Sequence, residues 1–184
     1  MNTEKNSVSN EALRNDYEEL LRAFNPSYVT ICQVPMKKED AGLMCIINVT
    51  VKAPTYYLSG KTDLTPKKTN RLTFEIRVPE GYPKVKPTVV YTGNKRLASV
   101  NVFTSGIQCT DDWNRGCSLF TLAKKTISDI VHEPSVTRYN SKATRSEELE
   151  AWQRGLKGPT VPMSKILISH NGARSNQPPA LPRR

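Results

Sequence analysis

The chain has 184 residues, a formal net charge of +10 and a hydrophobic content of 37%. Its apolar residues concentrate before about Trp152, which leaves ~150 residues for one hydrophobic core and excludes a need for disulfides or a structural metal. The basic charge is spread along loops and the C-terminal tail without an interleaved aromatic motif, so nucleic acid is not favoured as the main partner.

The first predicted element is an amphipathic helix, which Ser9 or Asn10 can cap and which Asn25-Pro26 ends. Residues 1–8 precede it and are predicted to be flexible. Apolar side chains recur on one face of this helix at the spacing of an α-helix. They are Leu13, Tyr17, Leu20, Leu21 and Phe24.

Four strands are predicted to follow, over 28–34, 43–51, 71–78 and 88–91. These runs are rich in β-branched residues or alternate apolar with polar side chains, as strands with one buried face do. The charged segment 35–42 is predicted to be the hairpin turn between the first two strands. Connected in sequence order, the strands would form an antiparallel meander.

Segment 93–116 has little periodicity and many turn formers, which in a compact domain is typical of a functional loop. An apolar helix face follows and ends at Glu133-Pro134, and a last helix is predicted over 141–154. The fold class predicted from this order is α+β. The domain spans 9–155, and the polar, basic, Pro-containing segment 156–184 has the composition of a disordered tail.

The cysteines and histidines predict neither a metal site nor a cofactor. Four cysteines occur without CxxC spacing, and only two histidines accompany them. The N-terminus has no apolar signal segment, and no run approaches the ~18 apolar residues that a membrane span requires. We therefore expect a cytoplasmic protein that does not associate with membranes and keeps its thiols reduced.

Cys109 is the strongest candidate for a functional residue. It follows a glycine-containing turn, and Asn101 lies a short loop upstream. A thiolate is a nucleophile, and a carboxamide N–H can stabilise the oxyanion that forms when a carbonyl is attacked. Cys32 and Cys45 lie in predicted strands, where cysteine packs as a small apolar side chain, and Cys117 precedes a helix.

The residues around this pair form an ordered series of motifs. Val78-Pro79, Tyr82-Pro83 and Pro87 resemble a Phe-Pro-x-x-Tyr-Pro-x-x-x-Pro signature. Asn101 stands where a His-Pro-Asn motif ends, and Cys109 where a Gly-x-x-Cys motif ends. Further matches follow downstream, namely Asp111, Trp113, Thr121-Leu122, Glu133-Pro134-Ser135, Asn140 and Ala143.

By their order and spacing these motifs resemble the ubiquitin-conjugating enzymes, which carry ubiquitin or a ubiquitin-like protein as a thioester. The resemblance covers 10–154 and implies the fold of that family. Ser99 and Val100 replace the His and Pro, Arg138 stands where the family has an acidic residue, and 60–70 resembles an insertion. These departures suggest a divergent member, for which a prokaryotic ubiquitin-like pathway would be a suitable setting.

The resemblance also implies roles for residues and a set of partners. Cys109 would accept the modifier, Asn101 would stabilise the oxyanion, and Asp111 or Asp112 would assist deprotonation of the acceptor amine in place of Arg138. The partners would be an activating enzyme, which the N-terminal helix and the loops after it would contact, the modifier itself, and a ligase or a protein target.

Other interpretations stay open at this point. A catalytically inactive relative would use the fold only to bind ubiquitin or a partner enzyme, although such relatives characteristically lack the cysteine. A cysteine hydrolase would need a histidine base, and neither His132 nor His170 has a suggestive context. Asn101 could cap a turn through its side chain, and Asp111 with Asp112 could be a solvated loop pair.

Overall fold

The computed structural model describes residues 3–60, 63, 65–103, 105–110, 113–114, 117–133, 147–157 and 160–168. The fold of this part is α+β, with an N-terminal helix, antiparallel sheets and later helices, as the sequence predicts. Its helices are α1 (Thr3–Ala23), the 3-10 helix η1 (Lys38–Asp40), α2 (Leu119–Ile130), α3 (Glu147–Arg154) and α4 (Met163–Ile166). Its strands are β1 (Val29–Val34), β2 (Leu43–Val51), β3 (Thr55–Ser59), β4 (Lys67–Thr69), β5 (Leu72–Pro79), β6 (Thr88–Tyr91) and β7 (Lys95–Leu97).

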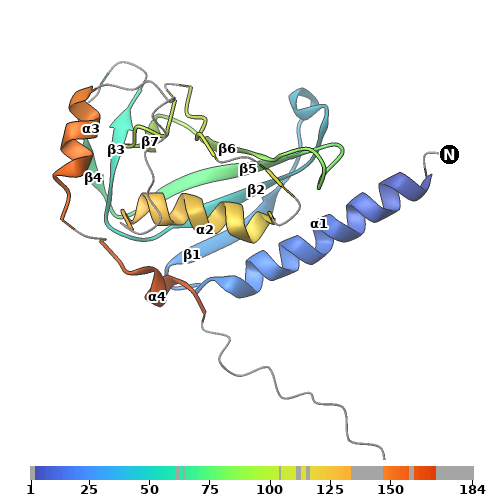
Figure 1. The fold of residues 1–184 in the computed structure, drawn as a ribbon. Helices are drawn as coiled ribbons and strands as arrows, with labels where there is room; N and C mark the ends of the chain where they lie inside the picture. Colours follow the sequence, from blue (N-terminus) through green and yellow to red (C-terminus); the bar gives the residue numbers. More distant parts are fainter. Residues whose placement is uncertain are drawn as a thin grey trace, which may run out of the picture.

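The larger sheet is antiparallel with the order β1-β2-β5-β6, which are the four predicted strands (Figure 1). In β5 the predicted alternation is confirmed, because Leu72, Phe74, Ile76 and Val78 are at most 2% exposed while the residues between them are half-buried. Their side chains share one core with apolar residues of α1 and α2. Burial of this apolar face is the main stabilising contribution to the fold.

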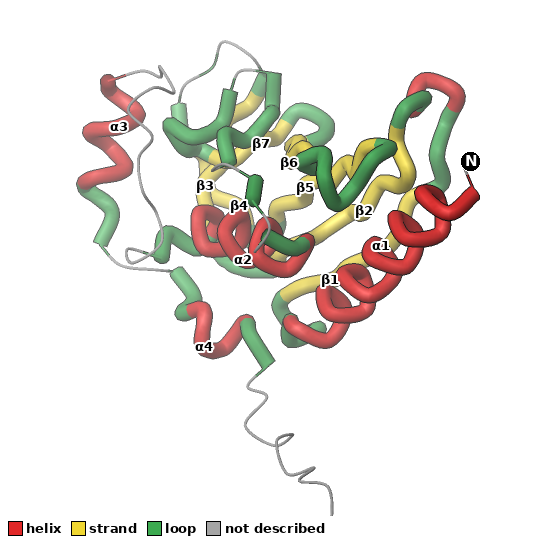
Figure 2. The backbone as a smooth tube through the Cα atoms, turned by 45° about the vertical axis from the view of Figure 1, so that its right-hand side comes forward, coloured by secondary structure: helices red, strands yellow, loops and turns green. Residues whose placement is uncertain are grey.

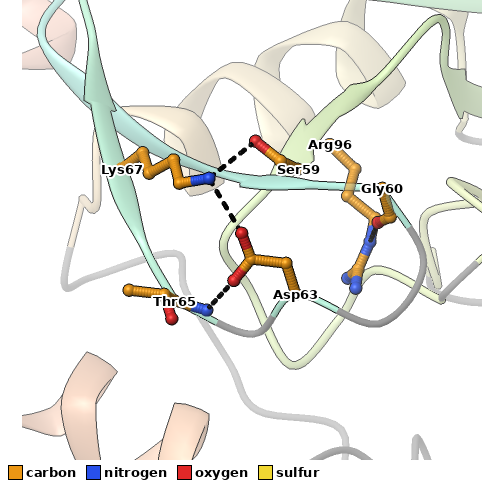
Figure 3. A network of polar contacts seen from close by, with 6 residues as sticks. All are labelled: Ser59, Gly60, Asp63, Thr65, Lys67 and Arg96. Carbon is orange, nitrogen blue, oxygen red and sulfur yellow. Dashed lines mark hydrogen bonds and ion pairs between the residues drawn. The ribbon is translucent and has the colours of Figure 1, made fainter.

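A second antiparallel sheet has the order β4-β3-β7, and of its strands only β4 lies within 60–70, the segment that resembled an insertion. In its β3–β4 connection, Asp63 contacts the Lys67 ammonium at 2.8 Å and accepts the Thr65 amide at 2.9 Å (Figure 3). The Lys67 hydrogen bond, with that of Thr65, lowers the pKa of Asp63 to about 2. Arg96, on β7, donates from Nε to the Gly60 carbonyl at 3.4 Å. The β3–β4 connection is therefore bonded to β4 through Lys67 and to β7 through Arg96.

The N-terminal helix differs from its prediction in two respects. It begins at Thr3, before the cap predicted at Ser9 or Asn10. Leu20 and Phe24 are buried as expected, but Leu21 is 46% exposed. Leu21 is one residue past Leu20, and each residue turns a helix by about 100°, so its side chain lies off the apolar stripe. No helix among the described residues is long and apolar enough to cross a membrane.

Part of the segment predicted to be a disordered tail is folded. Met163 and Ile166 of α4 are buried in the main core, and Phe24 pairs with Leu167 in an antiparallel bridge. The Ile168 amide donates to the Ala23 carbonyl at 2.9 Å. These contacts hold α4 beside the end of α1 and the start of β1 (Figures 1 and 2). The tail is polar on average, so its composition gave no indication that the short segment with Met163 and Ile166 would fold. Of the last predicted helix, residues 141–146 lie outside the described part of the chain.

Tyr82 connects α1 to the chain between β5 and β6. Its side chain is fully buried, and its hydroxyl donates to the Asp16 carboxylate, which also accepts the Leu119 amide at 3.4 Å. Burial, together with Asp16, raises the pKa of Tyr82. The Trp113 ring lies 6.0 Å from the Tyr82 ring, and its indole N–H donates to the Pro83 carbonyl at 2.6 Å. One carboxylate therefore joins α1, α2 and the Tyr82-Pro83 turn.

We expect Tyr82→Phe to lower the free energy of unfolding by about 1.5–3 kcal/mol, because it removes a hydrogen bond to a charged group and keeps the ring. Urea denaturation would measure the change. Tyr28→Phe is the matched control, since Tyr28 is a partly buried core tyrosine and should change stability little. Equal stability of Tyr82→Phe and the unsubstituted protein would show that the Asp16 contact contributes nothing.

Candidate active site

The chain folds back on itself between Asn101 and Cys109. The Cys109 amide donates to the Asn101 carbonyl at 2.6 Å, and Val102 forms an antiparallel bridge with Gln108. Closer to the tip, the Phe103 amide donates to the Ile107 carbonyl at 2.8 Å. The backbones of the two residues proposed from sequence are therefore hydrogen-bonded neighbours at the base of a short hairpin.

This hairpin, formed by 101–109, is added to the edge of the larger sheet beside β6. The Tyr91 amide donates to the Gly106 carbonyl at 2.8 Å, and the Gln108 amide donates to the Val89 carbonyl at 2.9 Å. Gly106 has φ +85°, and a Cβ there would lie 2.7 Å from the Tyr91 carbonyl oxygen. Both the left-handed backbone and the close approach to β6 therefore require glycine at this position.

A buried polar network fixes the residue immediately before the cysteine. The Tyr91 hydroxyl donates to Gln108 Oε1 at 2.9 Å, and Gln108 Nε2 donates to Asp129 Oδ2 at 2.7 Å. The three residues are 4%, 3% and 2% exposed. Burial, and then the Asp129 charge, raise the pKa of Tyr91 well above its usual value, so the phenol stays a hydrogen-bond donor. Gln108 thus links β6 to α2 and holds the cysteine side of the hairpin.

The two ends of the hairpin differ in exposure. Cys109 is partly exposed, whereas Asn101 is only 3% exposed. On the far side of the cysteine, Lys86 Nζ donates to the Thr110 carbonyl at 3.0 Å. The backbone is therefore held before, at and after Cys109, while the residue itself is partly accessible to solvent.

Ser99, which stands in the place of a histidine, supports Asn101 directly. Its Oγ accepts the Asn101 amide at 3.1 Å, and its carbonyl accepts the Val102 amide at 3.1 Å. Ser99 is 2% exposed, so these backbone groups are satisfied within the protein. The turn before Asn101 is thus held by the side chain and the carbonyl of Ser99.

The other three cysteines have different surroundings. Cys45 is buried, and burial raises the pKa of its thiol to about 11, whereas Cys32 is exposed on β1. Cys117 is partly exposed, and its Sγ lies 3.5 Å from Asn114 Oδ1. Cys117 lines a hollow of about 520 Å³ together with Pro83, Lys84, Trp113 and Asn114. Cys117 therefore also has a carboxamide beside it, and its amide donates to the Asn114 carbonyl at 3.0 Å as the Cys109 amide does to that of Asn101, whereas Cys32 and Cys45 lie within strands.

Several predicted site residues lie outside the described part of the chain. These are Asp111, Asp112 and Arg138, and the matches at Asn140 and Ala143. Among the described residues there is no group of three or more side chains suited to holding a metal ion.

Sequence interpretation missed the residues that hold the hairpin, above all Gln108 and Asp129. A signal was present for Asp129, which follows Leu122 by seven residues and so lies on the same apolar face of α2. A carboxylate on such a face predicts a buried hydrogen-bond partner. Nothing in the sequence indicates that the partner is Gln108.

Comparison with known proteins adds no relative. No protein-family model matches the chain, and no curated protein matches its sequence.

We expect Gln108→Leu to lower the free energy of unfolding by about 1–3 kcal/mol, because it removes a donor to the buried Asp129 carboxylate and an acceptor for Tyr91. Adding Asp129→Leu and Tyr91→Phe to Gln108→Leu should recover part of the loss, since no member of the network is then left buried without its partner. Urea denaturation would measure both changes. A loss that the added substitutions only increase would contradict the network's role.

Proposed function

We propose that this protein is a conjugating enzyme with a ubiquitin-conjugating-like fold, which carries ubiquitin or a ubiquitin-like protein on Cys109 and transfers it to an amine. The observation that carries the proposal is the hairpin that joins a partly exposed Cys109 to a buried Asn101 through a 2.6 Å backbone hydrogen bond. A nucleophile and an amide donor at the base of one rigid turn are the parts that acyl transfer needs.

The first step is a thioester exchange. The Cys109 thiolate attacks the carbonyl carbon of a modifier that is already a thioester on an activating enzyme. The bond between that carbon and Cys109 Sγ forms, the bond to the activating enzyme's sulfur breaks, and that sulfur leaves as a thiolate. A thioester is an activated acyl group, so this step requires no histidine base.

The second step is aminolysis. A neutral amine attacks the Cys109 thioester, the C–N bond forms, the C–S bond breaks, and Cys109 leaves as a thiolate while the amine loses a proton. Negative charge develops on the carbonyl oxygen before the C–S bond breaks. The carboxamide of Asn101 is the proposed donor to that oxyanion, because an amide that is held in place needs no reorganisation as charge develops. Asp111 stays the proposed group that assists loss of the amine proton.

The fold supports the proposal by the order of its parts. The described part of the chain begins with a helix, continues with the antiparallel strands of the sheet β1-β2-β5-β6, and has the helix α2 after the hairpin. The resemblance implies the same order of elements. An inactive binding module would need no accessible thiol in this turn. The partial exposure of Cys109 therefore favours the conjugating enzyme over the binding module. Such an enzyme would have an activating enzyme, the modifier, and a ligase or target as its partners.

The role of Cys109 can be tested with ubiquitin that carries a C-terminal 2-mercaptoethanesulfonate thioester, which replaces the activating enzyme. In a Cys32→Ser background, we expect an adduct that is visible on a non-reducing gel and disappears with reductant. Cys109→Ala should abolish it, because the acyl group then has no sulfur at the hairpin. Cys117→Ala is the matched control and should retain it. An adduct that survives Cys109→Ala, or one lost with Cys117→Ala, would contradict the assignment.

Asn101→Ala should leave loading of Cys109 unchanged and slow discharge onto free lysine by ~10²–10³, the usual effect of losing one oxyanion donor. Discharge would be followed as decay of the purified adduct at several lysine concentrations. Asn94→Ala, at an exposed turn residue between β6 and β7, is the control and should discharge at the unsubstituted rate. If Asn101→Ala impaired loading and discharge equally, Asn101 would only support the turn.

A further inference from the structure

Helix α3 reaches the Asn101 side of the hairpin through one side chain, Gln153. Its Nε2 donates to the Ala98 carbonyl at 2.6 Å, and its Oε1 accepts the Val100 amide at 3.2 Å. Gln153 is 6% exposed, so both bonds are shielded from water. One carboxamide therefore satisfies a donor and an acceptor of the segment that ends at Asn101.

These bonds replace a strand partner at the point where the chain leaves the smaller sheet. β7 pairs with β3 as far as Leu97, and the Ala98 amide still donates to the Tyr56 carbonyl at 3.0 Å. Beyond this point the Ala98 carbonyl and the Val100 amide have Gln153 as their partner. A buried backbone group without a partner is costly, so this carboxamide determines which path the buried chain can take.

The docking of α3 has an apolar part as well. Leu149 is 4% exposed and packs in a small cluster with Leu58, Ala98 and Val100. Leu149 and Gln153 are four residues apart and so lie on the same face of α3. On that face, Leu149 packs against 98–100 and excludes water, and Gln153 forms hydrogen bonds with the same segment.

We propose that Gln153 is a positioning residue for Asn101, on which it acts from a remote helix through the backbone of Ala98 and Val100. This inference rests on the proposed function, because its consequence is selective for the transfer step. The cysteine side of the hairpin is held separately, because the Gln108 side chain bonds to Asp129 and the Gln108 amide donates to the Val89 carbonyl. Loss of Gln153 therefore shifts 98–101 while Gln108, next to Cys109, stays anchored.

The experiment uses a full-length protein with Cys32→Ser and Cys117→Ser, loaded on Cys109 with the 2-mercaptoethanesulfonate thioester of acetyl-glycyl-glycine. Cys109 Sγ displaces the mercaptoethanesulfonate thiolate, and free lysine then takes the acyl group and releases Cys109. Gln153→Met keeps the side-chain length and removes both hydrogen bonds. We expect normal loading and about ten- to a hundred-fold slower aminolysis, as for a misplaced catalytic group. Gln33→Met, at an exposed position of β1, is the control and should change neither rate.

A double-substitution cycle separates positioning from a general structural role. If Gln153 acts through Asn101, then Gln153→Met has no further effect on aminolysis in an Asn101→Ala background. Equal slowing in both backgrounds, or an unchanged rate in the single variant, would overturn the proposal.

Amide hydrogen exchange tests the contact between Gln153 and the Val100 amide and requires no conjugation activity. In Gln153→Met the Val100 amide should lose protection while the Gln108 amide, which donates to the Val89 carbonyl, keeps its own. Retained protection at Val100 would overturn the proposal. If ubiquitin itself were never accepted by Cys109, the proposed function would fail, and the exchange and acetyl-glycyl-glycine measurements would still test the role of Gln153.

Discussion

The candidate site depends on one backbone hydrogen bond, between the Cys109 amide and the Asn101 carbonyl. It closes a hairpin that has no regular strand on its outer side, and buried backbone groups in such a segment need partners from side chains. Ser99 and Gln153 supply such partners to the backbone of 98–101, and the Gln108 side chain ties the hairpin to Tyr91 and Asp129. The polar interior of this region is thus a consequence of placing an irregular turn against a closely packed core.

The distribution of burial around this turn suits acyl transfer more than hydrolysis. A hydrolase must activate water, whereas thioester exchange begins from an activated acyl group and needs an accessible sulfur. Cys109 is partly exposed, while Asn101 is almost fully buried. An amide in a low-dielectric position interacts more strongly with developing charge than an amide in water does. Under the proposed function, the site combines an open nucleophile with a buried oxyanion donor.

The sequence predicted the parts of the fold whose apolar residues repeat regularly. The strands β1, β2, β5 and β6 and the helix α2 have clear periodicity, and their apolar faces form the core. The strands β4 and β7 have three residues each, and in β3 burial does not alternate, so these three strands carry no period that could be recognised. Cys109 and Asn101 were identified by local motifs. Gln108 and Gln153 were not, because their partners are distant in sequence and no local pattern records a single hydrogen bond.

The contacts of α3 explain how a turn without a proline before Asn101 is held. Where a His-Pro pair would stiffen the turn locally, this chain has Ser99 and Val100, which restrict the backbone less than a proline does. The lost local restraint must come from elsewhere, since a flexible turn would not hold Asn101 in a fixed position. Gln153 lies where it can provide that restraint, with hydrogen bonds on both sides of Ser99. The geometry of the turn therefore depends on a tertiary contact, the packing of α3 against 98–100.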